Sequence, residues 1–144
     1  SSWQIALKRM ANISFYLFET SQERQVDSAC RLCRKLLKKH PKIWWYCPDQ
    51  TLQGELDEAL WSFDPQSFIA HGIDQVHAPV CISAQLPDQS DWFVFNFNNQ
   101  ALEQIEQFGH IIEIIENNEA AKQLGREKFK FYRRLGVEPR TFKL

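Results

Sequence analysis

The chain has 144 residues, enough for one domain with a core of moderate size. Hydrophobic residues make up 44%, charged residues 24% and aromatic residues 13%, and the formal net charge is -1, which excludes nucleic-acid binding driven by overall charge. No apolar run approaches a membrane span and no signal peptide is recognisable, so we expect a cytoplasmic protein.

Strands and helices are expected to alternate along the chain. Residues 1–9 do not continue the pattern that follows, and we expect them to be a leader or an added extension before a domain over 10–144. The expected strands span 13–18, 43–47, 80–84, 92–97 and 109–115, and the expected helices 21–39, 49–61 and 117–135, with a tail at 137–144. This alternation predicts an α/β fold, a single domain with a mainly parallel sheet, helices on both faces and a Rossmann-like topology.

The loop after the first expected strand lacks the glycines of a nucleotide site. It contains Glu19 and Glu23 instead, whose carboxylates would repel a phosphate. No GxGxxG, GK[ST], GxSxG or HExxH motif occurs in the chain, and its histidines have no metal-ligand spacing. The sequence therefore predicts a non-catalytic protein with no cofactor and no metal.

Cys30 and Cys33 have the CxxC spacing of a redox or metal pair. Both also lie on the apolar stripe of the expected helix 21–39, beside Val26 and Leu36, and no second CxxC or histidine pair completes a zinc site. Packing of two reduced thiols in the core is favoured, and a metal or redox role is the alternative.

The C-terminal part of the chain is basic. Eight lysines and arginines between residues 122 and 143 face only two glutamates. On the last expected helix, one stripe at helical spacing consists of Lys122, Arg126, Lys130 and Arg133. Phe129 borders this basic stripe, and Leu124, Phe131 and Leu135 are expected to face the core. The stripe predicts an acidic partner, with a solvated face as the alternative.

Two stretches resemble a known family. One is Leu56-Asp-Glu-Ala-Leu-Trp61 with the following residues 64–71, and the other runs from Lys122 to Arg133 and closes with Gly136 and Thr141. They resemble the chi subunit of bacterial DNA polymerase III, as does the order of elements over 10–144, whereas the middle section is only weakly similar. The resemblance implies a subunit that joins the clamp loader through the psi subunit. It also implies binding of the acidic C-terminal tail of single-stranded DNA-binding protein, which ends in proline and phenylalanine.

The residue pattern and the resemblance together predict two binding surfaces. Arg126 is expected to hold the terminal carboxylate of the acidic tail, and the last phenylalanine of the tail to enter a pocket beside Phe129. The other members of this expected tail site are Lys122, Lys130, Arg133, Ile115, Gly136 and Thr141. Trp61 and Phe68 are expected to form the psi-binding surface, with burial in the core as the alternative. The chain departs from the family pattern at Phe129, where a tyrosine is usual.

A direct single-stranded nucleic-acid-binding domain is the alternative function. It would combine the basic stripe with the rings of Trp44, Trp45 and Trp92, on which bases could stack. Those rings belong to expected strands and not to the basic helix. We therefore expect nucleic acid to contact the chain only indirectly.

Overall fold

A computed structural model describes residues 11–40, 42–62 and 69–143. The expected leader at 1–9 and the candidate psi-binding residue Phe68 lie outside the described residues.

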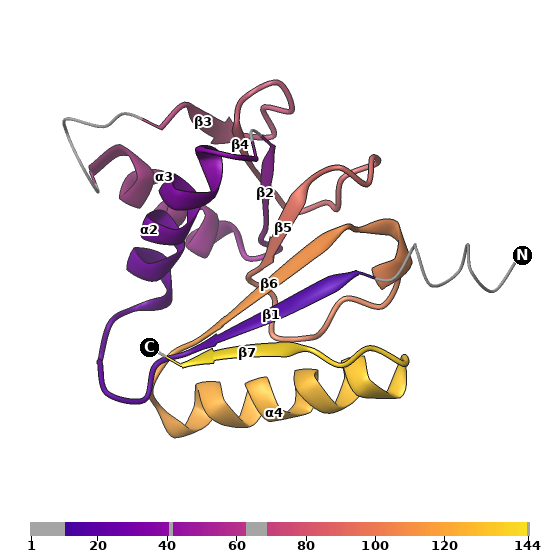
Figure 1. Ribbon diagram of the computed structural model, residues 1–144. Coiled ribbons are helices and arrows are strands. Elements are labelled where there is room, and N and C mark those ends of the chain that lie inside the picture. The colour runs from indigo at the N-terminus through magenta and orange to yellow at the C-terminus, as the bar shows by residue number, and fades with distance from the viewer. Residues whose placement is uncertain (1–10, 41, 63–68, 144) are drawn as a thin grey trace, which may run out of the picture.

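The described chain forms a seven-stranded sheet and three α-helices (Figure 1). The elements are β1 (Asn12–Leu17), α2 (Gln25–Leu37), β2 (Ile43–Tyr46), α3 (Gln50–Ser62), β3 (His71–Ile73), β4 (Val80–Ser83), β5 (Phe93–Asn96), η1 (Ile105–Gln107), β6 (His110–Ile115), α4 (Glu119–Arg134) and β7 (Arg140–Lys143). The sheet order is β3-β4-β2-β5-β6-β1-β7, and every pair of neighbouring strands is parallel. The α/β fold predicted from the sequence is confirmed. None of these helices is long and apolar enough to cross a membrane.

The two ends of the described chain build one edge of the sheet. β1 is the first strand in sequence, yet it lies between β6 and β7, the last two (Figure 1). Asn12–Leu17 pairs with His110–Ile115 on one side, and Ser14–Leu17 pairs with Arg140–Lys143 on the other. The basic C-terminal segment is thereby placed next to the apolar strand that opens the domain.

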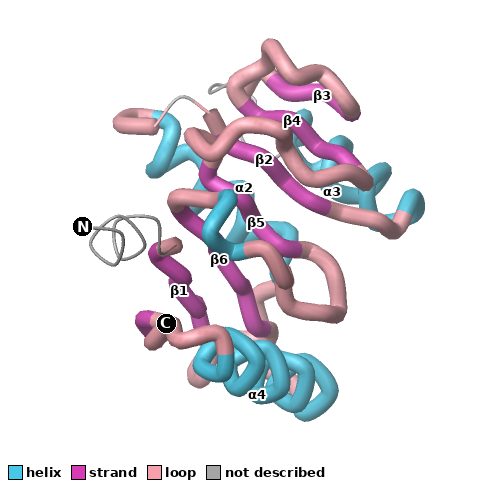
Figure 2. Tube along the Cα trace, turned by 90° about the vertical axis from the view of Figure 1, so that its right-hand side faces the viewer, coloured by secondary structure: helices cyan, strands magenta, loops and turns pink. Residues whose placement is uncertain are grey.

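Helices cover both faces of the sheet, as the sequence predicts. α2 and α3 pack on one face, and α4 lies against the other, at the edge made by β6, β1 and β7 (Figures 1 and 2). In β2, Trp45 belongs to the core cluster under α2 and α3, whereas Trp44 belongs to the cluster on the α4 face. Because successive side chains point to opposite faces, a strand buried on both faces is apolar throughout.

Cys30 and Cys33 are fully buried in the core cluster beneath α2, so the core-packing interpretation is confirmed. Burial raises the pKa of the Cys30 thiol to about 12, which disfavours the thiolate that redox chemistry needs near neutral pH. Within the residues that the structure describes, no group of three or more His, Cys, Asp or Glu side chains is placed to hold a metal ion.

Two strands are absent from the sequence-based prediction. β7 falls in the segment expected to be a tail, and β3 falls between the expected helix 49–61 and the next expected strand. Both are short edge strands whose side chains are mostly partly or fully exposed, so neither has an apolar pattern of its own. Their conformation comes from pairing with β1 and β4, which local sequence does not reveal.

Candidate functional site

α4 turns a mixed polar and small-residue face toward the sheet. Its buried residues are Gly125, Lys128 and Tyr132. The prediction that Leu124 and Leu135 face the core is wrong, since 39% and 43% of these residues is exposed. The expected helix face is rotated because a buried carboxylate on β6 attracts Lys128 and Tyr132 inward.

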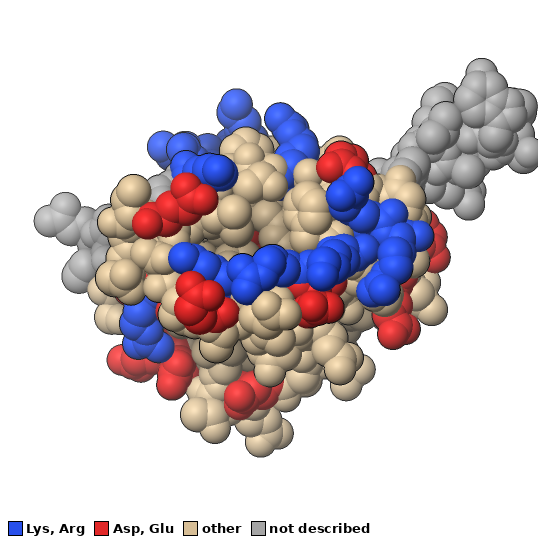
Figure 3. Space-filling model, turned by 90° about the horizontal axis from the view of Figure 1, so that it is seen from below, with Lys and Arg blue, Asp and Glu red and all other residues tan. Residues whose placement is uncertain are grey.

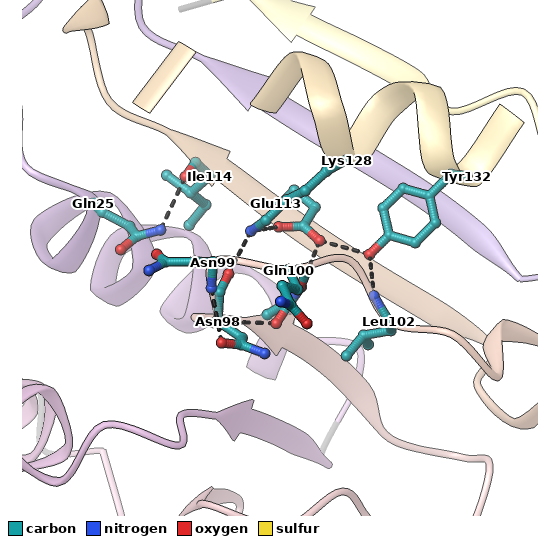
Figure 4. A network of polar contacts seen from close by, with 10 residues as sticks. Gln25, Asn98, Asn99, Gln100, Leu102, Glu113, Ile114, Lys128 and Tyr132 are labelled. Atoms are coloured by element: carbon teal, nitrogen blue, oxygen red, sulfur yellow. Dashed lines mark hydrogen bonds and ion pairs between the residues drawn. The ribbon is translucent and has the colours of Figure 1, made fainter. Parts of the chain in front are cut away.

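That carboxylate belongs to Glu113 and is the centre of a buried polar network between β6 and α4 (Figure 4). Lys128 Nζ donates to Glu113 Oε1 at 2.7 Å, and the Tyr132 hydroxyl donates to Glu113 Oε2 at 2.6 Å. Asn96 Nδ2 also donates to Oε2, at 2.8 Å. All four of these side chains are buried, so the network replaces water with fixed partners.

The network extends into the loop between β5 and η1. Lys128 Nζ donates a second hydrogen bond to the carbonyl oxygen of Asn98 at 2.6 Å, and the Leu102 amide donates to the Tyr132 hydroxyl at 3.1 Å. Burial and the neighbouring Glu113 charge raise the pKa of Tyr132, so its hydroxyl stays protonated and can donate. α4 is therefore fixed to the sheet at two positions one helical turn apart.

Gly125 lets the first half of α4 approach β6 closely. A Cβ atom at this position would lie 2.9 Å from Cδ1 of Ile115, closer than real Cβ contacts come. Gly125 is helical, so here its role is steric and not conformational. The close approach places the exposed side of α4 next to the end of β1.

A pocket of about 330 Å³ opens between α4, the ends of β1 and β6, and β7. Its lining residues are Phe15, Leu17, Phe18, Glu19, Ile115, Glu116, Lys122, Gly125, Arg126, Phe129 and Thr141. The wall is aromatic: the Phe129 ring, partly buried, meets the Phe15 ring edge-to-face with centroids 5.3 Å apart. We call this cavity the α4 pocket.

The structure brings together five of the eight residues expected in the tail site: Ile115, Lys122, Arg126, Phe129 and Thr141. The other three do not line the α4 pocket. Gly136, with φ of 92°, ends α4 at its far end. Lys130 and Arg133 are exposed further along the helix.

Cations form a band along α4 on the face seen in Figure 3. Arg126 lies at the pocket and is exposed, and its guanidinium contacts only the neutral Gln123 side chain, at 2.9 Å, among the partners described. Arg133 lies 3.3 Å from Glu138, and Lys128 belongs to the buried network, so not every basic residue of this segment is available to a ligand. The pocket can thus receive an apolar group with a negative charge beside it.

Sequence reasoning missed the β1 side of the α4 pocket. Phe15, Leu17 and Phe18 come from the opposite end of the chain, and the placement of β1 between β6 and β7 brings them to α4. Gly125 is the one signal present in the sequence, because a glycine inside a helix of otherwise larger residues suggests close packing.

Trp61 lies at the other edge of the sheet. It sits at the end of α3 with 56% of the residue exposed, and its ring meets His71 of β3 at 5.1 Å between centroids. Ile73, on the same strand, and Val76, in the turn after it, are also exposed. The structure thus places Trp61 on the surface, and not in the core.

The tryptophans on which the nucleic-acid alternative depends are buried. Exposure is 5% for Trp44, 0% for Trp45 and 5% for Trp92, and the rings of Trp44 and Trp92 pack against each other at 5.1 Å. They offer no open ring face on which a base could stack.

Comparison with known proteins places the chain in a family. The model of the family described as DNA polymerase III chi subunit, HolC, matches residues 10–140. Among curated relatives, DNA polymerase III subunit chi of Pseudomonas aeruginosa is 28% identical over 131 residues, covering 88% of this chain and 92% of the relative. The proteins of the same name from Haemophilus influenzae and Escherichia coli are 26% and 24% identical, covering 85% and 92% of this chain and 90% and 97% of the relatives. The chain belongs to the DNA polymerase III chi subunit family.

Proposed function

We propose that the chain is a non-catalytic subunit of the clamp-loader complex, which binds the acidic C-terminal tail of single-stranded DNA-binding protein and pairs with the psi subunit. The observation that carries this proposal is the α4 pocket, in which an aromatic wall and an exposed arginine lie side by side. A replication subunit of this kind would work in the cytoplasm.

The chemistry of the α4 pocket fits a peptide that ends in phenylalanine. The ring would pack between Phe129 and Ile115, and Arg126 would pair with the terminal carboxylate through two parallel N–H donors. Burial of the ring contributes roughly 2–3 kcal/mol, and the charged hydrogen bonds about 1.5–3 kcal/mol. After the cost of association, the expected dissociation constant is on the order of micromolar.

The distribution of charge around the pocket gives the peptide a direction. Glu19 and Glu116 lie at the pocket and would repel aspartates. Lys130 and Arg133 are exposed further along α4, away from these carboxylates. The acidic residues that precede the terminal phenylalanine would therefore run along α4 toward Lys130, and toward Arg133 in exchange for its exposed pair with Glu138. Each contact contributes little because both partners are solvated.

Trp61 is the proposed anchor for psi. Its ring is exposed and contacts His71 at an edge of the sheet. Ile73 and Val76, which follow His71 closely in sequence, are exposed as well. Exposed large apolar side chains of this kind are typical of the centre of a protein interface. Phe68, the second expected member of this surface, lies outside the described residues.

Titration with a labelled peptide of the acidic tail tests the proposal. Arg126→Ala should weaken binding roughly tenfold or more, because a charge-assisted hydrogen bond is lost. A peptide without its last phenylalanine should lose at least as much. Arg134→Ala is the matched control, since Arg134 is an exposed arginine of α4 that does not line the pocket. If Arg126→Ala and the shortened peptide both leave the affinity within about twofold, the tail does not bind in this pocket.

A further inference from the structure

A larger groove lies on the opposite side of β1 from the α4 pocket. It has a volume of about 780 Å³ and is bordered by α2, by the end of β1 and by β6. Tyr16 and Leu32, both partly exposed, supply the accessible part of its apolar lining, and the buried Phe18 and Ile114 lie beneath them. Phe18 lines both cavities, so they meet at the end of β1 without sharing a helix. We call this second cavity the α2 groove.

The apolar lining is held in place by packing inside the sheet. Tyr16 of β1 and Phe142 of β7 stack with centroids 5.0 Å apart, and both remain partly exposed. Gln25, on the first turn of α2, donates to the carbonyl oxygen of Ile114 at 3.0 Å and joins the helix to β6 (Figure 4). The groove is thus part of the folded domain, with walls on two elements that are bonded to each other.

Cations dominate the rim of the α2 groove. Arg31, Arg34, Lys35 and Lys38 line it from α2, and among the lining residues that the structure describes Glu23 is the one acidic residue. Glu23 is paired with Arg31. Lys35 and Lys38 are exposed, and neither has a carboxylate partner within the described residues. The groove therefore combines an apolar lining with uncompensated positive charge.

We propose that the α2 groove binds an acidic peptide segment of a partner protein, one that carries apolar side chains for the groove and carboxylates for Lys35 and Lys38. Charge complementarity selects the acidic partner, and the apolar lining selects a peptide over a phosphate backbone. A nucleic-acid strand would need open ring faces for its bases, whereas Phe18 is 2% exposed and Tyr16 already stacks on Phe142. This site is separate from the α4 pocket and independent of what binds there.

The probe for the test is a short labelled peptide that alternates glutamate with leucine and phenylalanine and ends in an amide. The amide removes the terminal carboxylate that the α4 pocket would bind through Arg126. Lys35→Glu/Lys38→Glu should weaken binding of this peptide roughly tenfold, because two attractions become repulsions. Lys42→Glu/Arg134→Glu is the control with the same change of charge, at positions that line neither the α2 groove nor the α4 pocket, and should leave binding within about twofold.

Two further measurements distinguish binding at this site from nonspecific binding to a cationic surface. A peptide with serine in place of leucine and phenylalanine should bind roughly tenfold more weakly, since its apolar contacts are gone. A thymidine oligonucleotide should fail to displace the original peptide. Equal losses in the two charge-reversal variants, unchanged binding of the serine peptide, or displacement by the oligonucleotide would each overturn the proposal.

Discussion

The two edges of the sheet present different chemistry. At the β7 edge, α4 carries exposed cations beside an aromatic pocket and is held down by the buried Glu113–Lys128 pair. At the β3 edge, three large apolar side chains are exposed, those of Trp61, Ile73 and Val76. The sheet order separates the edges by six strand steps, or roughly 29 Å at about 4.8 Å a step.

Under the proposed function, this difference would let one small domain join two partners. At the apolar edge, a partner would bury the large ring of Trp61, and binding of this kind is insensitive to salt. At the cationic edge, positive charge beside a small pocket favours an acidic peptide. Because the edges are so far apart, occupation of one leaves the other open. The proposed role of linking two proteins would use this separation.

Substitution within the buried Glu113–Lys128 pair should cause the largest loss of stability. Lys128→Met leaves Glu113 buried without its cation, and we expect a loss of about 3–5 kcal/mol in the free energy of unfolding, measured by urea titration. Lys130→Met removes a lysine two residues further along α4 that is exposed, and should change stability by less than about 0.5 kcal/mol. Equal losses in the two variants would show that the internal pair does not hold α4 in place.

Trp61 should give the next largest effect, on binding and not on folding. Trp61→Ala should weaken association with psi by roughly 2 kcal/mol or more, whereas its unfolding curve should change little because the ring is largely exposed. Leu124→Ala, which shortens an exposed side chain on α4, is the control at the other edge. If Trp61→Ala unfolds the domain and psi still binds the folded fraction with full affinity, Trp61 is a core residue.

Ionic strength should affect binding at the two edges differently. Raising the ionic strength shortens the range of the exposed charges on α4, so binding of the acidic tail should weaken by about 1 kcal/mol, or roughly fivefold. Association with psi at the apolar edge should stay nearly constant. Parallel titrations at low and high salt measure both. A similar salt dependence at the two edges would contradict their assignment to different chemistry.

The smallest expected effect is a dependence of stability on pH, caused by a histidine inside the sheet. His110 of β6 packs on Phe93 at 4.0 Å between centroids, with His40 6.2 Å away. Burial, and then the neighbouring His40, lower the pKa of His110 below its ordinary 6.5. The unfolded chain therefore binds this proton more readily. The stability contributed by neutral His110 is fully present above the ordinary pKa and is lost as the pH falls from there through the lower pKa of the folded state.

Urea titrations near pH 7.5 and pH 5.5, roughly one unit on either side of the ordinary histidine pKa, should show lower stability at the lower pH. His110→Gln should reduce this difference, whereas His77→Gln, at an exposed histidine, should not. The assignment to His110 fails if both variants keep the full dependence on pH.

Local pattern was enough to predict most of the secondary structure and part of the α4 pocket. Asp49 and Asn118 lie where the expected helices begin, and they cap α3 and α4, each with a carboxylate or amide oxygen that accepts from a backbone N–H of the first turn. Lys122, Arg126 and Phe129 could be placed on one side of a helix because helical periodicity depends only on near neighbours in the chain.

Tertiary structure alone decided the rest. Lys128 looks like another surface cation in the sequence, yet it is buried because Glu113 meets it from a strand fifteen residues earlier. β7 has no strand pattern of its own and forms by pairing with β1, which also brings Phe15 and Phe18 to the α4 pocket. The sequence by itself thus determined which segments become helices and strands and where charge collects along α4. Which side chains meet across the sheet depended on the pairing of distant segments, because non-local contacts leave no periodic trace in the chain.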